Sequence, residues 1–517
     1  MGGNVDFHET LLAEIASGKI ADKTQLQKRK IQLCRELRME TLPPNSETLA
    51  KASEELRPLV REVLRRKPVR TLSGVAVVAT MTSPAPCPHG RCAYCPGGVE
   101  NSSPQSYTGK EPAARRAISN NFEPRLQTSK RMEQLEAIGH ATDKIDLIIM
   151  GGTFTSRPLD YQEWFVKGCF DAMNEVDSVE LHQAHMLNET APHRCIGLTV
   201  ETRPDTFDER MADHCMSLGT TRVEFGVQIL DDEILRGVSR GHGVKEVEAA
   251  TRVAKEKGLK VCYHLMPGLP GAGPEKDIES FRTVFEDERF RPDMLKIYPT
   301  LVVKGTPLYE SWKRGEYEPY DTEKATQVVA AMKSLTPKWV RIQRIQRDIP
   351  VQLIEAGVDK SHLRELAKAR LGAQGKKCNC IRCREVGLNR VPPSRLKDAE
   401  LKTDVYRASG GEERFIALEL PEELLGGYAR LRINADGAEA HLRELKVFGL
   451  VAQIGKPGGE WQHRGLGKSL VAEAERQAAA SGCDEIMVTS GVGVRIYYES
   501  LGYVRSGAYM AKPLRAR

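Results

Sequence analysis

The chain of 517 residues carries a formal net charge of +6, with 40% hydrophobic and 28% charged residues. This length exceeds what one hydrophobic core usually supports, so we expect two or three domains. No apolar run is long enough to cross a bilayer, and the N-terminus has acidic residues and no signal-peptide core, which excludes an integral membrane protein and favours a cytoplasmic location. Six of the twelve cysteines crowd into two short windows, a pattern that favours metal binding over disulfides.

The first predicted region, residues 1–70, is mostly helical and rich in basic side chains. It contains 14 Lys and Arg against 10 Asp and Glu, and Pro43 and Pro44 separate two basic stretches. Such a local excess of positive charge favours contact with nucleic-acid phosphates, and a solvated helix face is the alternative. The two stretches contain Lys28, Arg29, Lys30, Arg35 and Arg38, and then Arg57, Arg61, Arg65, Arg66, Lys67 and Arg70.

Residues 71–336 alternate short β-rich runs with helical stretches. This alternation predicts an α/β fold of parallel βα units that close toward a partial (β/α) barrel. In such barrels the chemistry lies on the loops that follow the strands. The predicted strands cover residues 75–80, 145–150, 195–200, 222–227, 260–265 and 294–299.

Three cysteines follow the first of these strands, in the segment CPHGRCAYCPGG. Cys87, Cys92 and Cys95 can hold three irons of a [4Fe–4S] cluster and leave the fourth iron without a protein ligand. An open iron binds the amino and carboxylate groups of S-adenosylmethionine (SAM), so that an electron passing to the sulfonium releases a 5′-deoxyadenosyl radical. The cysteines therefore predict a radical SAM barrel, although four residues separate the first two cysteines where three are usual. A zinc knuckle that lacks one ligand is the alternative.

Residues at the ends of later strands are candidates for cofactor contacts. Gly151, Gly152 and Thr153 follow the second strand, where the missing Cβ atoms would let the backbone approach the methionine amine closely. Polar residues beyond the other strands are expected either to bind the ribose, the carboxylate or a substrate, or to form structural ion pairs. These residues are Glu201, Arg203, Gln228 and Arg240.

Residues 337–400 are predicted to form a basic linker with a second cysteine cluster. Cys378, Cys380 and Cys383 lack the glycines of a cofactor loop, so we expect a structural zinc ion. Its fourth ligand stays open, with His362 and Cys34 as candidates, and three unligated thiols are the alternative reading. Basic residues at every third position beside Trp339 favour contact with single-stranded RNA. These residues are Lys338, Arg341, Arg344 and Arg347.

Residues 401–517 are predicted to form a second domain of the α+β class. Gln462, Gly465 and Gly467 make the Q-x-x-G-x-G turn that is typical of GNAT acetyltransferases, in which backbone N–H groups at a helix N-terminus hold the pyrophosphate of coenzyme A. A later tyrosine-rich turn at Tyr498 is typical of the same fold. The predicted strands before the glycine turn cover residues 415–420, 429–434 and 441–448.

These motifs together resemble one family, the catalytic subunit of Elongator, a tRNA uridine C5-carboxymethyltransferase. The compact cysteine loop is similar to that of the archaeal and bacterial members. The resemblance extends from about residue 70 to the C-terminus. It rests on CPHGRCAYCPGG, QSYTGKEPAARRA, DKIDLIIMGGTF, ETRPD, RGH, KIYPTLVVKGTPLYE, RIQRDIP, REL, ELKVFG, QHRGLGKSL and SGVGVRIYY.

The resemblance implies a carbon–carbon bond-forming reaction on the anticodon stem-loop of tRNA. The adenosyl radical takes a hydrogen atom from the methyl group of acetyl-CoA, the carbon radical adds to C5 of the wobble uridine, position 34, and hydrolysis leaves 5-carboxymethyluridine. It also implies that Lys144 contacts acetyl-CoA, while Lys446 departs from the histidine expected in relatives. The other implied acetyl-CoA contacts are Glu444, Leu445, Lys446, Val447, Leu466, Gly467, Lys468 and Tyr498.

Two other functions compete with this interpretation. A protein lysine acetyltransferase with a structural iron–sulfur cluster would acetylate peptides without SAM. A tRNA-binding scaffold with decayed sites would lack at least one ligand or glycine motif, and none is missing. The sequence leaves open whether the chain forms a homodimer or joins Elongator-like partners.

Overall fold

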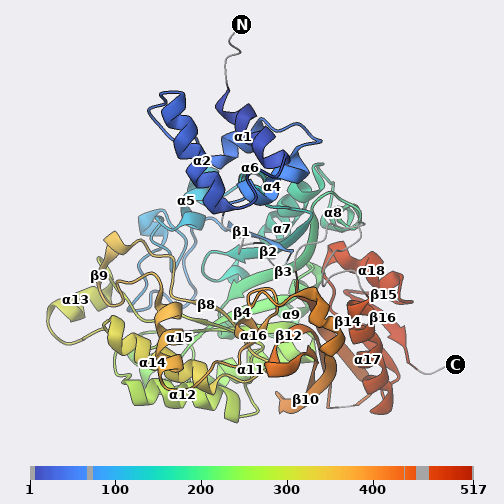
Figure 1. The fold of residues 1–517 in the computed structure, drawn as a ribbon. Coiled ribbons are helices and arrows are strands. Elements are labelled where there is room, and N and C mark those ends of the chain that lie inside the picture. The colour runs from blue at the N-terminus through green and yellow to red at the C-terminus, as the bar shows by residue number, and fades with distance from the viewer. Residues whose placement is uncertain (1–5, 67–70, 72–73, 436, 450–464, 515–517) are drawn as a thin grey trace, which may run out of the picture.

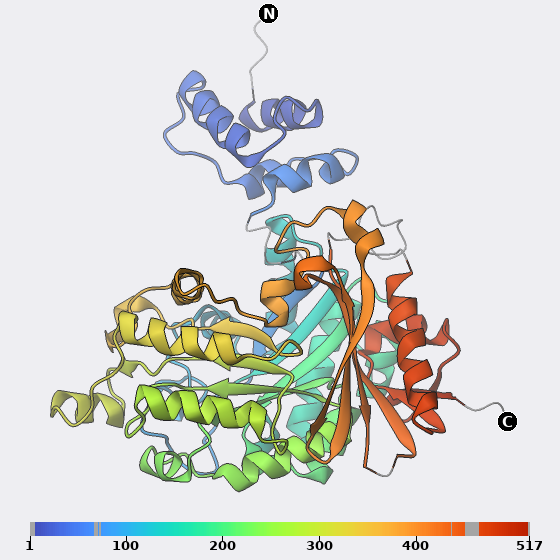
Figure 2. The ribbon, with the colours of Figure 1, turned by 60° about the horizontal axis from the view of Figure 1, so that its bottom comes forward.

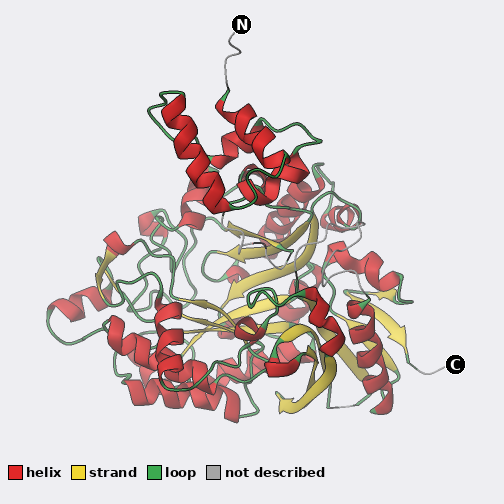
Figure 3. Cartoon of the chain, in the orientation of Figure 1, coloured by secondary structure: helices red, strands yellow, loops and turns green. Residues whose placement is uncertain are grey.

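The computed structural model describes residues 6–66, 71, 74–435, 437–449 and 465–514, and Figure 1 shows three parts in chain order. A bundle of short helices comes first, a curled parallel sheet with covering helices follows, and a second sheet with few helices comes last (Figure 3). None of the described helices combines the length and the apolar character that crossing a bilayer requires.

The N-terminal helices form a small bundle that stands apart from the two sheets (Figure 2). The side chains of Asp6 and Asp22 accept backbone hydrogen bonds at the starts of the first two helices, which fixes where these helices begin. Leu11 and Leu33 are buried inside the bundle, and Arg61 ties it to the next part by donating a 2.9 Å hydrogen bond to the carbonyl of Gly139. The helices are α1 (Phe7–Ala16), α2 (Lys23–Glu36), α3 (Asn45–Ala50) and α4 (Arg57–Leu64).

The central sheet of the described chain has seven parallel strands in the order β1-β2-β3-β4-β5-β6-β8. Each strand lies beside its predecessor because the intervening helices return the chain to the same edge. The six predicted strands are all present, which confirms the partial barrel. The strands are β1 (Ala76–Met81), β2 (Lys144–Met150), β3 (Arg194–Thr202), β4 (Arg222–Gln228), β5 (Lys260–Leu265), β6 (Met294–Ile297) and β8 (Arg341–Ile345).

The seventh strand, β8, lies in the segment that the sequence predicts to be a linker. Ile342 and Ile345 are buried in the core, whereas Arg341 forms a 2.7 Å ion pair with Glu385. In the pairing of β8 with β6, Gln343 has no partner residue and forms a β-bulge. The bulge breaks the two-residue alternation of a regular strand. The basic residues at every third position therefore belong to a bulged strand, and the boundary expected at residue 336 falls before the last strand of the barrel.

Helices cover the outer face of the barrel and complete a large apolar core (Figure 2). Phe165 and Val166 of α7, for example, are fully buried. A small two-stranded sheet pairs β7 (Val302–Val303) with β9 (Ile354–Ala356). The helices are α5 (Pro112–Ser119), α6 (Pro124–Ala137), α7 (Leu159–Asn174), α8 (Leu181–Asn188), α9 (Glu209–Ser217), α10 (Asp232–Gly237), α11 (Val244–Glu256), α12 (Pro274–Glu286), α13 (Pro307–Lys313), α14 (Thr322–Leu335), α15 (Leu363–Ala373) and α16 (Ile381–Arg384).

The C-terminal sheet is mixed, with the order β10-β11-β12-β13-β14-β16-β15 in the described residues. Its strands pair antiparallel except β13 and β14, which run parallel, and α17 packs across it. This layout confirms the predicted α+β acetyltransferase-like domain. The elements are β10 (Glu400–Ala408), β11 (Gly411–Glu419), β12 (Leu425–Ile433), β13 (Glu439–Val447), α17 (Leu466–Ala480), β14 (Glu485–Val488), α18 (Arg495–Glu499), β15 (Val504–Ser506) and β16 (Tyr509–Pro513).

A buried cluster of charges joins the C-terminal sheet to the barrel. Arg443 of β13 lies 2.6 Å from Asp293, which precedes β6, and 2.7 Å from Glu413 of β11. Lys255 of α11 and Arg432 of β12 also pair with Glu413, at 3.3 and 3.0 Å. All five side chains are at most 1% exposed, so the ion pairs replace the water that each charge has lost. Burial alone would raise the pKa of Asp293, but the charge of Arg443 holds it well below its usual range.

Candidate active site

The cysteine loop after β1 brings three thiols to the carboxyl end of the barrel. The backbone N–H of Ser106 donates to Sγ of Cys95 at 3.3 Å, and Nη1 of Arg240 donates to Sγ of Cys92 at 3.6 Å. The hydroxyl of Thr153 lies 3.5 Å from Sγ of Cys87. Donors directed at sulfur stabilise thiolates and are a usual feature of iron–sulfur sites. The donor set therefore fits a cluster held by Cys87, Cys92 and Cys95.

The separation of the sulfur atoms distinguishes this loop from a zinc site. Zinc–sulfur bonds of about 2.3 Å bring tetrahedral thiolates to within about 4 Å of one another, whereas each cysteine of a cluster binds a different iron. In the described chain, Cys87, Cys92 and Cys95 do not form a group whose ligand atoms all lie within 4.8 Å. The three sulfur atoms of this loop are therefore spaced differently from those of Cys378, Cys380 and Cys383.

The Gly-Gly turn after β2 packs directly against the cysteine loop. Gly151 has φ +130°, and a Cβ there would lie 2.1 Å from Oγ1 of Thr82. Gly152 has φ +96°, and a Cβ there would lie 2.9 Å from Cβ of Gln105. Both positions require glycine so that β1 and the segment beyond the cysteines can approach this turn. The close approach seen is to the protein's own atoms, and contact with the methionine amine stays a prediction.

A cavity of about 130 Å³ opens at the carboxyl ends of the strands, beside the cysteine loop. Most of the predicted strand-end residues meet here, because parallel strands all end at this edge. Gly151 is the exception, since it lies next to the cavity wall and not in it. The predicted residues that line the cavity are Cys87, Gly152, Thr153, Glu201, Arg203, Gln228 and Arg240.

Three of these polar residues are also held by the protein. Arg203 forms a 2.7 Å ion pair with Asp205 and donates to the carbonyl of Arg240 at 2.8 Å. Arg240 donates in turn to the carbonyl of Gly226 at 2.6 Å. Glu201 accepts a 2.9 Å hydrogen bond from the hydroxyl of Tyr107 and pairs with a lysine described below. These contacts fix the side chains in place whether or not they also touch a cofactor.

A column of buried charges fills the bore of the barrel, and the sequence prediction missed it. Lys296 of β6 pairs with Glu201 at 3.0 Å and also with Glu224 of β4. Glu224 also pairs with Arg222 at 3.4 Å, and Arg222 pairs with Asp146 at 3.3 Å. The clue in the sequence is the presence of charged residues in otherwise apolar strand runs, one in MLKIYP and two in RVEFGV.

This column contains a group of potential metal ligands, Glu224, Cys262 and His264, whose ligand atoms lie within 4.8 Å of one another. Two cations, Lys296 and Arg222, already neutralise Glu224. Burial raises the pKa of the Cys262 thiol well above its usual range, so it stays protonated. A metal ion would add positive charge beside these cations, and the group is better described as an ion-pair network.

A second cavity, of about 550 Å³, lies where the amino ends of the barrel strands meet the C-terminal sheet. Lys144, Arg222 and Lys260, the first residues of β2, β4 and β5, form the barrel side. The N-terminus of α17 forms part of the other side, where Gly465 has φ +81°. A helix N-terminus attracts phosphate groups, which fits the pyrophosphate of coenzyme A.

The residues that the resemblance assigns to acetyl-CoA all line this cavity, with Gly465. Gln462 lies outside the described residues. Arg222, Lys260 and Asp146 were not predicted, and nothing in the sequence pattern distinguishes these strand residues from structural ones. The predicted residues that line the cavity are Lys144, Glu444, Leu445, Lys446, Val447, Gly465, Leu466, Gly467, Lys468 and Tyr498.

Burial lowers the pKa of several lysines that line this second cavity. It lowers the pKa of Lys260 to about 8, and it also lowers the pKa of Lys144. The pKa of Lys446 falls through burial and through the neighbouring charge of Arg341. Glu444 stays ionised because Arg430, at 2.8 Å, and other cations lower its pKa to about 2 despite burial.

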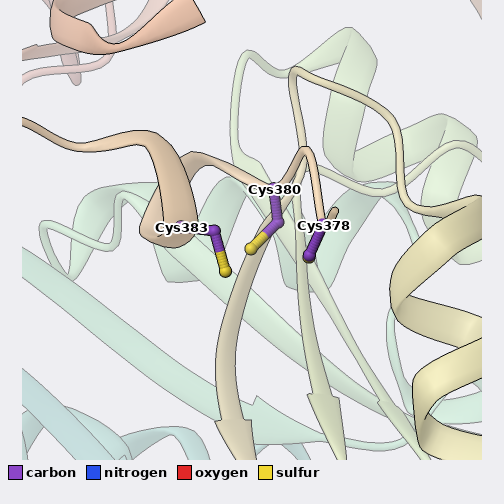
Figure 4. A group of neighbouring side chains, drawn as sticks. All are labelled: Cys378, Cys380 and Cys383. Carbon is purple, nitrogen blue, oxygen red and sulfur yellow. The ribbon is translucent and has the colours of Figure 1, made fainter. Parts of the chain in front are cut away.

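The second cysteine cluster converges on one point (Figure 4). Sγ atoms of Cys378, Cys380 and Cys383 all lie within 4.8 Å of one another, as ligands of a single metal ion do. Hydrogen bonds from Cys378 and Cys383 lower the pKa of the Cys380 thiol, whereas the pKa values of Cys378 and Cys383 themselves are raised. In the described chain neither His362 nor Cys34 joins the group, and Cys34 packs against the N-terminal bundle instead.

Some of the predicted RNA-binding residues are buried or bound within the protein, and others are exposed to solvent. Trp339 stacks on Tyr406 with ring centroids 4.1 Å apart, so it is not free to stack on a base. Lys30 is buried and donates to the carbonyl of Pro43, and Arg61 is bound to a backbone carbonyl. Lys67 and Arg70 lie outside the described residues. Of the basic residues in the bundle that were predicted to bind RNA, those exposed to solvent are Lys28, Arg35, Arg38, Arg57 and Arg66.

Three family models match successive parts of the chain. Residues 5–72 match the ELP3 N-terminal domain, residues 83–284 the radical SAM superfamily and residues 292–372 the radical SAM C-terminal domain. The chain is 49% identical to a tRNA uridine(34) acetyltransferase of Methanocaldococcus infernus, over 98% of both chains. It is 40% identical to human Elongator complex protein 3, over 99% of this chain and 96% of that one. The structure of Elp3 from M. infernus, lacking its N-terminus, superposes with a TM-score of 0.76 at 45% identity, covering 86% of this chain and 100% of that one.

Proposed function

The chain belongs to the family of Elongator complex protein 3 and the tRNA uridine(34) acetyltransferases, and on that premise we propose that it forms 5-carboxymethyluridine at the wobble position of tRNA from acetyl-CoA. The observation that carries this proposal is the presence of two cavities on one barrel. Cys87 and Tyr94 of the cysteine loop line the carboxyl-end cavity, and the helix N-terminus of α17 opens on the amino-end cavity.

The residues of the first cavity would hold the radical-forming group. Cys87, Cys92 and Cys95 would bind a [4Fe–4S] cluster, and Glu201 and Thr153 would contact SAM. When bound, the cluster and SAM together supply a 5′-deoxyadenosyl radical, which abstracts a hydrogen atom. Burial lowers the pKa of His89 to about 4, so this imidazole beside Cys92 is neutral near pH 7 and adds no proton to the thiolate.

The residues of the second cavity would bind acetyl-CoA. The N–H groups at Leu466 and Gly467 would hold the pyrophosphate, and strand β13 would lie beside the pantetheine arm. Arg222 separates this cavity from the first one, since it lines the second cavity and pairs with Glu224, which lines the first. The acetyl group would therefore enter the bore past this ion pair.

The test is an anaerobic incubation of the reconstituted protein with tRNA, acetyl-CoA, SAM and dithionite, followed by mass spectrometry of the nucleosides. We expect 5-carboxymethyluridine and 5′-deoxyadenosine, each dependent on SAM. The competing function, lysine acetylation with a structural cluster, would yield acetylated peptides without SAM. That outcome, with no modified uridine, would replace the proposal.

We also propose that exposed basic residues of α2 and of the turn that follows it contact tRNA phosphates, and that the protein acts in the cytoplasm. The triple variant Lys28→Ala, Arg35→Ala, Arg38→Ala is expected to bind tRNA more weakly. The slope of log affinity against log salt should fall by about one for each lost phosphate contact. Filter binding between low and high salt measures both quantities.

The matched control for this variant removes three exposed basic residues at the opposite end of the molecule in Figure 1. Lys245→Ala, Arg252→Ala and Lys276→Ala lie on α11 and α12 and should leave affinity and salt slope unchanged. Equal losses in the two triple variants would mean that general charge, and not the N-terminal bundle, attracts the tRNA.

The thiols Cys378, Cys380 and Cys383 are proposed to hold a structural zinc ion. Elemental analysis of the purified protein should find one zinc per chain, and Cys380→Ser should lose it and lower the melting temperature. Cys483→Ser, which changes a buried cysteine of the C-terminal sheet, should keep the zinc. Full zinc content in Cys380→Ser would exclude this site.

A further inference from the structure

A histidine and a carboxylate inside the barrel form a hydrogen-bonded pair. Nε2 of His264 lies 2.8 Å from Oε2 of Glu224. Glu224 is fully buried, whereas His264 is 15% exposed and lines the cavity beside the cysteine loop. A carboxylate that accepts from one ring nitrogen fixes the tautomer of the imidazole and leaves the other nitrogen as a base.

The surroundings hold this pair in one orientation. Lys296 and Arg222 both pair with Glu224, so the carboxylate cannot rotate freely, and Tyr298 packs edge-on against the imidazole. Within the described chain, Nδ1 of His264 makes no hydrogen bond. The free nitrogen belongs to a side chain that lines the cavity, where a water molecule can reach it.

The pair also lies at the junction of the two cavities. Glu224 lines the first cavity, and its ion-pair partner Arg222 lines the second. The two residues lie two positions apart on β4, a distance of about 7 Å along a strand. An acetyl thioester that passes from the second cavity into the first therefore brings its carbonyl carbon beside His264.

The proposed function requires water at this point. A carboxymethyl group made from an acetyl thioester needs the carbon–sulfur bond to be broken and a new carbon–oxygen bond to be formed. No oxidant or reductant is involved, and the step needs one base and one acid. His264 can serve as this base, because a partner carboxylate orients its ring and its side chain lines the cavity.

We propose that His264, oriented by Glu224, is the general base that hydrolyses the CoA thioester attached to the modified uridine. Water gives a proton to Nδ1 of His264 while its oxygen bonds to the thioester carbonyl carbon. The carbon–sulfur bond then breaks, and the imidazolium returns the proton to the departing CoA thiolate, leaving the carboxylic acid. Positive charge on Lys296, Arg344 and Arg347, which line the same cavity, favours the oxyanion of this step. This inference rests on the proposed function.

The experiment compares the wild-type enzyme with His264→Gln and His264→Ala under the anaerobic conditions described above. Nuclease digests of the tRNA are analysed for 5-carboxymethyluridine and for uridine that still carries coenzyme A. Both variants are expected to make 5′-deoxyadenosine but to release 5-carboxymethyluridine about 100- to 10,000-fold more slowly. The CoA-linked uridine should accumulate and convert to 5-carboxymethyluridine on treatment with alkali. Added imidazole should speed release in His264→Ala and not in the wild type.

One control variant and three named outcomes make the experiment decisive. His182→Gln changes an exposed histidine on α8 and should behave as the wild type. Release of 5-carboxymethyluridine at the wild-type rate from His264→Gln would overturn the inference, and so would loss of 5′-deoxyadenosine, which would place His264 in an earlier step. A wild-type enzyme that forms neither 5′-deoxyadenosine nor modified uridine would instead contradict the proposed function.

Discussion

Replacing Cys92 by alanine is expected to abolish uridine modification and the formation of 5′-deoxyadenosine. Cys92 is 4% exposed, and its sulfur lies within reach of Arg240 and His89. With one thiolate missing, the loop can no longer hold three irons, so the radical cannot form. Acetyl-CoA binding should persist, because the second cavity lies at the other end of the strands. Iron content, the cluster's visible absorption and nucleoside analysis measure these effects.

A buried cysteine outside both clusters gives the control for this variant. Cys215→Ala removes a fully buried thiol from α9 and should retain iron, 5′-deoxyadenosine formation and product. Modified uridine formed by Cys92→Ala at the rate of Cys215→Ala would refute the assignment of the cysteine loop.

Replacing Asp293 by asparagine is expected to cost about 3–5 kcal/mol of stability. This carboxylate is fully buried and lies 2.6 Å from Arg443, 3.6 Å from Arg430 and 3.8 Å from Lys255. Its removal leaves these cations facing one another with less negative charge and no access to water. Thermal and chemical denaturation should show a clear fall in the melting temperature and in the denaturant midpoint.

An exposed carboxylate gives the control for this change of charge. Glu279→Gln breaks an ion pair with Arg282 in which Glu279 is 65% exposed, and it should change stability by less than about 1 kcal/mol. Similar effects of the two variants would show that the buried ion cluster does not hold the two sheets together.

The parts of the fold with regular patterns could be predicted from the sequence. Apolar β-rich runs alternating with helices are sufficient to locate six strands of the barrel, because a buried parallel strand needs a continuous apolar run. Strand β8 was not predicted, because its arginines and the bulge at Gln343 interrupt the apolar run that marks a buried strand. Trp339 was misread for a related reason, since its partner Tyr406 is distant in the sequence.

The candidate site could be predicted only where a motif carries the chemistry. The cysteine spacing and the glycine turn led to residues that line the two cavities, such as Cys87 and Gly467. The column containing Glu224 and His264 could not be assigned, because its meaning depends on which charged residues of separate strands meet inside the bore. Such pairings are set by the register of β4, β5 and β6, so charged residues within the strand runs do not reveal which partners they meet.

The buried ion cluster makes residue 400 a poor place to cut this protein into fragments. A C-terminal fragment would expose Arg432 and Arg443 on the face of a sheet, with Asp293 and Lys255 left in the other piece. A chimera that grafts the acyl-CoA half of one relative onto the barrel of another must therefore transplant both sides of this contact together.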